Sequence, residues 1–205
     1  MNLQIHFSIE LEGERVKNTL AKMEWYRLHG YRPYVPDGMN ETSSEEEIVR
    51  AIRATYKPEH YQVVAEKLMA DFTNIEHLFE RQLIAVFQKD IPSIFDVRLT
   101  QYGVSGSYQL PNFITFEIDS KDGIQTLFHE MIHLMIESDV QTYGVKQWEK
   151  ERTVDLILHS EPFAFLEYQK WQRNYHGVEK IVDPLFHELF FTDIHQFFKQ
   201  VSSKK

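Results

Sequence analysis

The stretch 121–138 reads KDGIQTLFHEMIHLMIES and contains the most informative motif of the chain. It has helical periodicity and contains His129-Glu130-Met131-Ile132-His133, an HExxH motif. Positions four apart lie one above the other on an α-helix, so both histidines project from one face and can share a metal ion. Glu130 lies about 100° further round the helix. Its carboxylate can therefore reach a metal-bound water without ligating the metal.

The apolar residues around the motif predict a helix with one buried face. They fall on the arc opposite the two histidines: Ile124, Leu127, Met131, Leu134 and Met135. Asp122 and Gln125 are typical of an N-cap and its partner at the start of such a helix. We expect this helix to present its histidine face to a cleft. The alternative is a half-buried helix whose histidines are satisfied by neighbouring side chains.

Composition limits the classes of function. The chain has 205 residues, 14% of them aromatic, which suits one large folded domain or two small packed ones. Its formal net charge is −9 and it has no long Lys/Arg run, so we expect neither nucleic-acid nor membrane binding. The absence of cysteine excludes disulfides, thiolate nucleophiles and cysteine metal ligands. A metal must be held by histidines and carboxylates, which suits Zn²⁺.

The N-terminal sequence MNLQIHFSIELEGER lacks the basic and apolar regions of a secretory signal. No apolar run approaches the roughly 18 residues that suggest a membrane span. We therefore expect a cytoplasmic protein.

Hydrophobic periodicity predicts an α+β fold. Alternation over 3–11 predicts a strand, and 29–44 is expected to be a loop. A second alternating region from Val97 to Ile118 predicts a meander of two or three strands that leads into the HExxH helix. Helical periodicity recurs at 15–28, 45–56, 58–72, 76–87, 145–160, 162–175 and 184–200. Ser43 or Ser44 with Glu46 or Glu47, and Thr73 with Glu76, are possible capping boxes.

These elements predict a small, mainly antiparallel sheet packed on the HExxH helix, with helical N-terminal and C-terminal parts. Residues 1–92 form an N-terminal strand and helical region in this interpretation. Residues 93–205 form a second region that contains the HExxH helix and the C-terminal helices, and we expect the two regions to form one compact unit.

A zinc site usually has three protein ligands, so a third is expected besides the histidines. Asp139 follows His133 by six residues, as the last ligand does in metzincin-like proteases. Those chains need a glycine where this one has Ile136. Without a glycine the helix is expected to continue and to carry Asp139 away from the metal.

Two further candidates lie in the next predicted helix. Its buried arc is defined by Val154, Ile157 and Leu158. Glu151 lies at the edge of this arc and Glu149 roughly opposite, so Glu151 is expected to point inwards. Asp155 follows one turn later on the same face, where it can accept a hydrogen bond from a ligating histidine. The alternative for this pair of carboxylates is a solvated acidic strip.

The sequence His129-Glu130-x-x-His133 followed by Glu151-x-x-x-Asp155 resembles the gluzincin metallopeptidases, the thermolysin-like group, including their compact single-domain members. The resemblance covers about 112–158. It implies a zincin-like fold with one Zn²⁺ per chain, held by the two histidines and Glu151. It also implies Glu130 as the catalytic base and Asp155 as the carboxylate that supports a ligand histidine.

Gluzincins also have an edge strand that pairs with extended substrate. The resemblance implies this role for Phe113, Ile114, Thr115 and Phe116. No stretch matches the histidine or tyrosine that stabilises the transition state in that family. The candidates lie in the C-terminal helices, where a packing role is the alternative for each: Tyr168, Tyr175, His176, His187 and His195.

The sequence therefore predicts zinc-dependent hydrolysis of peptide bonds in a peptide or protein substrate. Glu130 would take the proton of the attacking water and deliver it to the leaving amine. Two alternatives remain open. One is a non-catalytic, metal-stabilised interaction domain, and the other is a regulatory protease with a single protein target.

Overall fold

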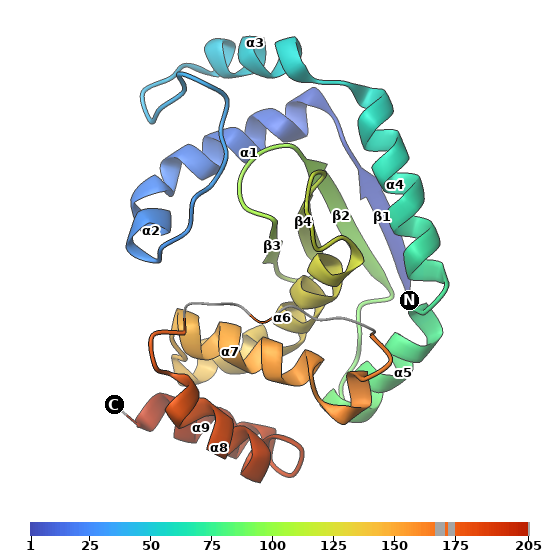
Figure 1. Ribbon diagram of the computed structural model, residues 1–205, viewed down its shortest axis with the longest axis vertical. Coiled ribbons are helices and arrows are strands. Elements are labelled where there is room, and N and C mark those ends of the chain that lie inside the picture. Colours follow the sequence, from blue (N-terminus) through green and yellow to red (C-terminus); the bar gives the residue numbers. More distant parts are fainter. Residues whose placement is uncertain (167–170, 172–174, 205) are drawn as a thin grey trace. The chain divides into compact units, whose positions relative to one another are not determined.

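The computed structural model describes residues 1–166, 171 and 175–204. These residues form an α+β structure with nine α-helices and a small, four-stranded mixed sheet (Figure 1). The chain divides into two compact units. The first unit comprises Met1–Asn74 with Ser93–Leu127, and the second comprises Ile75–Pro92 with Phe128–Lys205. Each unit contains residues from both sides of the predicted division at residue 92, and the N-terminal strand pairs with a strand that follows it.

The sheet belongs to the first unit and has the order β1-β2-β4-β3. Its strands are β1 (Asn2–His6), β2 (Ile94–Thr100), β3 (Gly106–Gln109) and β4 (Phe113–Glu117). β1 pairs with β2 and β2 with β4 in parallel, and only β3 and β4 are antiparallel. The prediction of a mainly antiparallel sheet is therefore wrong. After β2 the chain forms β3 at the edge of the sheet and then turns back, so that β4 lies between β2 and β3 (Figure 1).

The strand predicted to bind substrate is not an edge strand. β4 contains Phe113, Ile114, Thr115 and Phe116 and has a partner on each side. Thr115, for example, lies opposite Arg98 of β2 and Ser107 of β3. A substrate cannot add to β4 without displacing a neighbour. The edges of the sheet are β1 and β3.

The predicted strand at 3–11 ends early. β1 stops at His6, and α1 (Ile9–Ala21) begins where the alternating pattern still continues. Ser8 is the reason, because its Oγ accepts the Leu11 N–H at 3.2 Å and so caps the helix. The predicted helix at 15–28 consequently starts earlier, and it divides at Lys22 into α1 and α2 (Met23–Leu28).

Local signals predicted the next helices well. The segment 29–44 is a loop with one isolated bridge, and α3 (Glu45–Thr55) follows it. The Ser44–Glu47 capping box is present: Ser44 Oγ accepts the Glu47 N–H at 3.3 Å, and Glu47 accepts the Ser44 N–H at 2.8 Å. α4 (Pro58–Thr73) and α5 (Glu76–Phe87) occur as predicted. Thr73 does not cap α5, because its hydroxyl donates back to the Met69 carbonyl at 2.8 Å.

In the first unit α1 packs against α3 (Figure 1). Their buried residues form a core with the chain after β2: Val16, Leu20, Ile48, Ile52 and Tyr102. Glu12 of α1 is fully buried and accepts hydrogen bonds from the Tyr61 hydroxyl, from Thr100 Oγ1 at 2.6 Å and from the Gln101 N–H at 2.6 Å. Burial raises the pKa of Glu12, and these three donors oppose that rise. One carboxylate thus ties α1 to α4 and to the end of β2.

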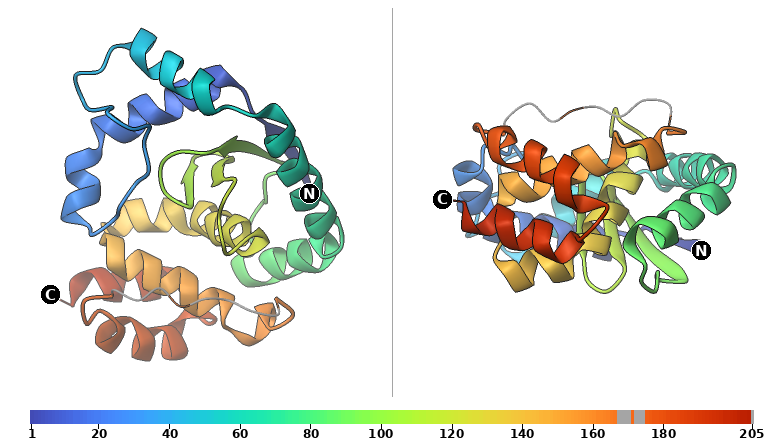
Figure 2. Two further views of the ribbon diagram at one scale, coloured as in Figure 1. Left: turned by 45° about the horizontal axis from the view of Figure 1, so that its top comes forward. Right: turned by 90° about the horizontal axis from the view of Figure 1, so that it is seen from below.

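The second unit is helical. α6 (Ile124–Tyr143) begins in the first unit and continues into the second, where it is joined by α7 (Gln147–Leu158), α8 (Glu179–Leu185) and α9 (Ile194–Ser203). α8 lies against both α7 and α9 (Figure 2). The predicted helix at 184–200 is interrupted, because Asp193 accepts the Gln196 N–H at 2.9 Å and caps a new helix. Of the predicted helix at 162–175, residues 161–166 form a 3₁₀ turn and bends, and most of the rest lies outside the described residues.

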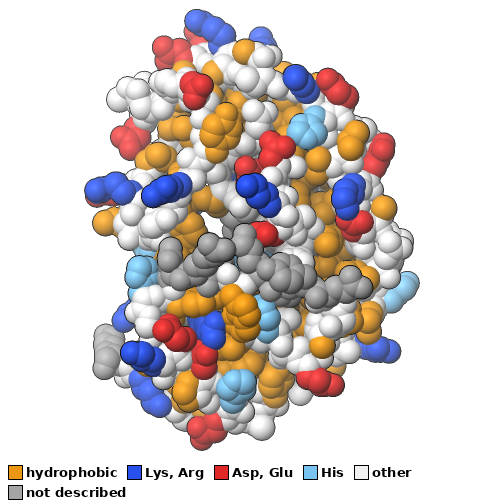
Figure 3. Space-filling model, in the orientation of Figure 1, with side chains coloured by type: hydrophobic (Ala, Val, Ile, Leu, Met, Phe, Trp, Pro, Cys, Tyr) orange, Lys and Arg blue, Asp and Glu red, His pale blue; other side chains and the backbone are white. Residues whose placement is uncertain are grey.

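Acidic and basic side chains are interspersed on the surface of the first unit (Figure 3). Lys17 lies 3.8 Å from Glu45, and Arg98 lies 3.7 Å from Glu14. Exposed pairs of this kind contribute little to stability. Within the described parts of the chain, no helix has both the length and the apolar character needed to cross a membrane.

Candidate metal centre

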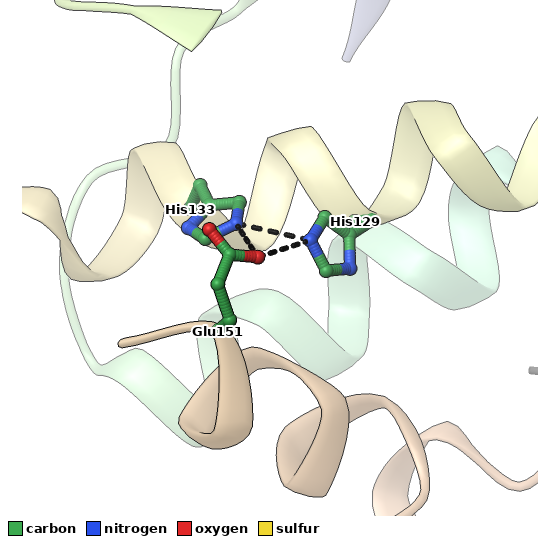
Figure 4. Close-up of side chains that lie close together, drawn as sticks. All are labelled: His129, His133 and Glu151. Atoms are coloured by element: carbon green, nitrogen blue, oxygen red, sulfur yellow. Dashed lines mark hydrogen bonds and ion pairs between the residues drawn. The ribbon is translucent and has the colours of Figure 1, made fainter. Parts of the chain in front are cut away.

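The two histidines of the HExxH motif meet on α6. His129 Nε2 and His133 Nε2 lie 3.0 Å apart, as expected for side chains one turn apart on the same face (Figure 4). α6 is more buried than its sequence predicts, because every residue from Leu127 to Ile136 is buried except His129. The exposed fraction of the side chain is 17% for His129 and 2% for His133. The site is therefore held in a packed interior and approaches solvent at His129.

α7 supplies the third side chain. Glu151 Oε2 lies 3.2 Å from His129 Nε2 and 3.3 Å from His133 Nε2 (Figure 4). The structure thus brings together the three residues predicted as ligands. One donor atom from each lies within 4.8 Å of the others, so the group can hold a metal ion.

The spacing of the donor atoms fits a small divalent ion. Tetrahedral zinc holds nitrogen and oxygen ligands at about 2.0–2.1 Å, which separates two such ligands by roughly 3.3 Å. The three separations here are 3.0, 3.2 and 3.3 Å. Two imidazoles and one carboxylate also form a donor set that suits zinc and several transition metals. Little rearrangement is needed for the three side chains to bind one ion.

Gln147 orients the carboxylate of Glu151. Its Nε2 donates to Glu151 Oε1 at 2.6 Å, so Oε2 is the oxygen that faces the histidines. The two residues are one turn apart at the start of α7. Sequence reasoning missed Gln147. An amide four residues before a ligand glutamate was the available signal.

Asp155 lies behind His129, as the resemblance to gluzincins implied. Its Oδ1 is 3.6 Å from His129 Nδ1, and its Oδ2 accepts a hydrogen bond from the Tyr175 hydroxyl. Burial raises the pKa of Tyr175, and the charge of Asp155 raises it further. The hydroxyl therefore stays protonated and remains a donor to Asp155.

The metal-free group has a defined charge. Burial lowers the pKa of His129, but the hydrogen bond and charge of Glu151 and the charge of Asp155 outweigh burial and raise this pKa to about 9. Burial dominates at His133 and lowers its pKa to about 4. Burial would raise the pKa of Glu151, but the two histidines hold it well below its usual value. At neutral pH, Glu151 is ionised, His133 is neutral and His129 carries a proton.

Glu130 is buried beside the group, with 6% of its surface exposed. Its negative charge contributes to the raised pKa of His129, which places the carboxylate in the electrostatic environment of the histidine. The three-residue group that can hold a metal does not include Glu130.

Two rival ligands are engaged elsewhere. α6 continues past Ile136, as predicted, and Asp139 Oδ1 lies 2.8 Å from His195 Nδ1. Glu149 was predicted to lie opposite the buried arc, but only 5% of its surface is exposed. Its carboxylate accepts the Lys146 N–H at 2.9 Å and so caps the start of α7.

Four of the five predicted transition-state donors lie in the described part of the chain, and each has another contact there. Tyr168 lies outside the described residues. Tyr175 and His195 bind carboxylates, whereas the rings of His176 and His187 pack against aromatic side chains. The role of such a donor stays a prediction.

Comparisons of the chain with family models, with curated proteins and with solved structures found no match. The resemblance to gluzincins therefore stays a prediction that rests on the motif residues.

Proposed function

We propose that this protein is a zinc-dependent metallopeptidase of zincin-like type that acts on a peptide or protein substrate. The observation that carries the proposal is the convergence of His129, His133 and Glu151 at separations of 3.0–3.3 Å. Glu130 lies beside the first ligand, and Asp155 supports it from behind. This combination of three ligands with a non-ligating glutamate suits hydrolysis assisted by a metal.

The two histidines and Glu151 would hold one zinc ion per chain. Bound zinc supplies Lewis acidity, which polarises a carbonyl group and lowers the pKa of water towards about 7.

Glu130 would act as the general base and then as the general acid. Its carboxylate accepts a proton from the water that attacks the peptide carbonyl. The same carboxyl group then gives this proton to the amine nitrogen as the C–N bond breaks.

The proposal is tested by Glu130→Gln, which keeps the size of the side chain and removes the base. We expect the variant to bind zinc like the wild type and to lose at least about 10²-fold in the rate of peptide hydrolysis. Rates are measured on unstructured peptides and on a cognate cell lysate in which new N-termini are labelled. Glu137→Gln is the matched control, since Glu137 lies on the same helix and binds Gln141. Full activity in Glu130→Gln would show that the proposed base is wrong.

Burial of the ligands favours one second candidate function. The side chains of His133 and Glu151 are 2% and 7% exposed, as in a site that serves to join α6 and α7. A metal with this purely structural role would stabilise the second unit without catalysis. Zinc-loaded wild-type protein that cleaves neither the peptides nor any protein of the lysate would support this candidate. Cleavage of one lysate protein alone would instead indicate a regulatory protease.

A further inference from the structure

The Asp155 carboxylate is held from two sides. Oδ1 faces Nδ1 of the ligand His129 at 3.6 Å, and Oδ2 accepts the hydrogen bond of the Tyr175 hydroxyl. Only 2% of the surface of Asp155 is exposed, so water competes little for its oxygens. Each of its two oxygens thus faces a different side chain.

Tyr175 is in turn held by Arg152, the residue that follows the ligand Glu151. The guanidinium carbon of Arg152 lies 4.7 Å from the centre of the Tyr175 ring and 4.5 Å from that of Trp171. Its Nε and Nη2 donate to the two oxygens of Asp183 at 2.8 and 2.6 Å. Such a two-point bond fixes the plane of a guanidinium group, and with it the surface on which a ring can stack.

One short segment, residues 175–183, carries two of the partners of Arg152, Tyr175 and Asp183. Tyr175 precedes a tight turn into α8, and Asp183 lies on α8 itself. The turn is closed by a bond of 3.1 Å from the Val178 N–H to the Tyr175 carbonyl. It contains left-handed backbone at His176 (φ 54°) and Gly177 (φ 87°). The backbone of 175–183 and α7 therefore together position Tyr175, Asp183 and Arg152.

A histidine that binds a metal through Nε2 must carry its proton on Nδ1, and an acceptor behind the ring fixes both this tautomer and the ring orientation. The carboxylate of Asp155 lies 3.6 Å from Nδ1 of His129, which places it to take this role. A carboxylate fixed on one side only can rotate away from the ring, whereas a donor on its second oxygen prevents this rotation.

We propose that Tyr175 is a positioning residue of the metal centre: it holds Asp155 against His129, and Arg152 with Asp183 holds Tyr175. The inference rests on the metal site of the proposed function and not on peptidase activity. It predicts that the loss of one hydroxyl group that touches no ligand weakens metal binding.

The test is a double-mutant cycle on the intact chain, with Zn²⁺ affinity measured by competition with a chromophoric chelator. Asp155→Asn is expected to weaken binding by about 10–100-fold. Tyr175→Phe acts one bond further from the metal, and we expect a loss of about 3–10-fold. The double variant should bind no more weakly than Asp155→Asn alone, because residues that act through a shared partner are not additive.

Two further variants separate positioning from general destabilisation. Tyr143→Phe removes a hydroxyl group at the end of α6 that makes no hydrogen bond to any described residue of the site, so it should bind zinc like the wild type. Arg152→Lys keeps the charge but loses the two-point bond to Asp183. It should weaken binding in the same direction as Tyr175→Phe, and it should cause little further loss when combined with that variant.

Each outcome decides a different claim. Wild-type zinc affinity in Tyr175→Phe would overturn the inference. The inference would also be overturned if Tyr175→Phe weakened zinc binding by the same factor in the wild-type background and in the Asp155→Asn background. Wild-type protein that takes up no zinc would overturn the metal site and the inference together. Wild-type protein that binds zinc tightly but hydrolyses nothing would overturn the peptidase proposal and leave this inference intact.

Discussion

Single residues behind the ligands decide how well the site can bind a metal. Glu151 has two oxygens, and the bond of 2.6 Å from Gln147 occupies Oε1 and leaves Oε2 beside the histidines. Without that bond the carboxylate gains rotational freedom that metal binding must remove. Gln147 and Glu151 lie one turn apart on α7, so the helix itself places the amide that orients the carboxylate.

We therefore predict that Gln147→Leu weakens Zn²⁺ affinity by about 10-fold, the lower end of the usual effect of outer hydrogen-bond partners. Chelator competition measures the change. Gln141→Leu is the matched control, because Gln141 is exposed on α6 and binds Glu137. Equal affinities of Gln147→Leu and wild type would contradict the proposed orientation of Glu151.

Protonation of the histidines gives a second prediction. At pH 6 the metal-free group holds one exchangeable proton on His129, whose pKa is about 9, while His133, with a pKa of about 4, is neutral. Zinc needs both imidazoles unprotonated at Nε2, so binding should release one proton per ion. Affinity should accordingly rise about tenfold per pH unit between the two pKa values and level off above the higher one.

Calorimetry at pH 6 in buffers of different ionisation enthalpy counts the released protons. This pH lies below the pKa of about 7 of zinc-bound water, so the water adds little to the count. Release of no proton, or of two, would contradict the charge state described for the metal-free group.

The sequence predicted the three residues of the group and the carboxylate behind them, but not the roles of Gln147 and Tyr175. His129, His133, Glu151 and Asp155 lie at helical spacings that fix their faces locally. Tyr175 reaches Asp155 from another segment, and no spacing rule connects the two.

At the scale of elements, strong local signals decided the helices and long-range contacts decided the sheet. Pro58 and Ser44 marked helix starts correctly because their effects act within one turn. Ser8 overrode the alternating pattern that follows it for the same reason. The alternation of polar and apolar residues shows which face of the sheet each residue lies on, but not which strands are neighbours. It therefore could not predict the order of β2, β3 and β4.

The capping box of α3 offers a test at this scale. Ser44→Ala should lower the free energy of unfolding by about 1 kcal/mol, because the Glu47 N–H loses Ser44 Oγ as its acceptor. Urea unfolding measures the loss. Ser44→Asp should restore most of the stability, since aspartate keeps an acceptor at the cap. Full stability of Ser44→Ala would show that the box contributes nothing.

At the scale of the whole molecule, the division into units escaped prediction because it follows pairing between distant segments. Asn2 pairs with Ile94, which joins the N-terminus to the middle of the chain, while 75–92 belongs to the second unit. Composition predicted a folded chain and limited any metal ligands to histidines and carboxylates, since neither inference depends on topology. The residues of the metal group all lie in the second unit.

The most direct test of the account is the metal content of the purified protein, measured by elemental analysis. Wild type is compared with Glu151→Ala and with Glu149→Ala, a matched control that removes a carboxylate from the same helix but outside the group. We predict about one zinc per chain in wild type and in Glu149→Ala, and little in Glu151→Ala. Wild-type protein that stays free of zinc after incubation with the ion, or Glu151→Ala that keeps a full equivalent, would contradict the account.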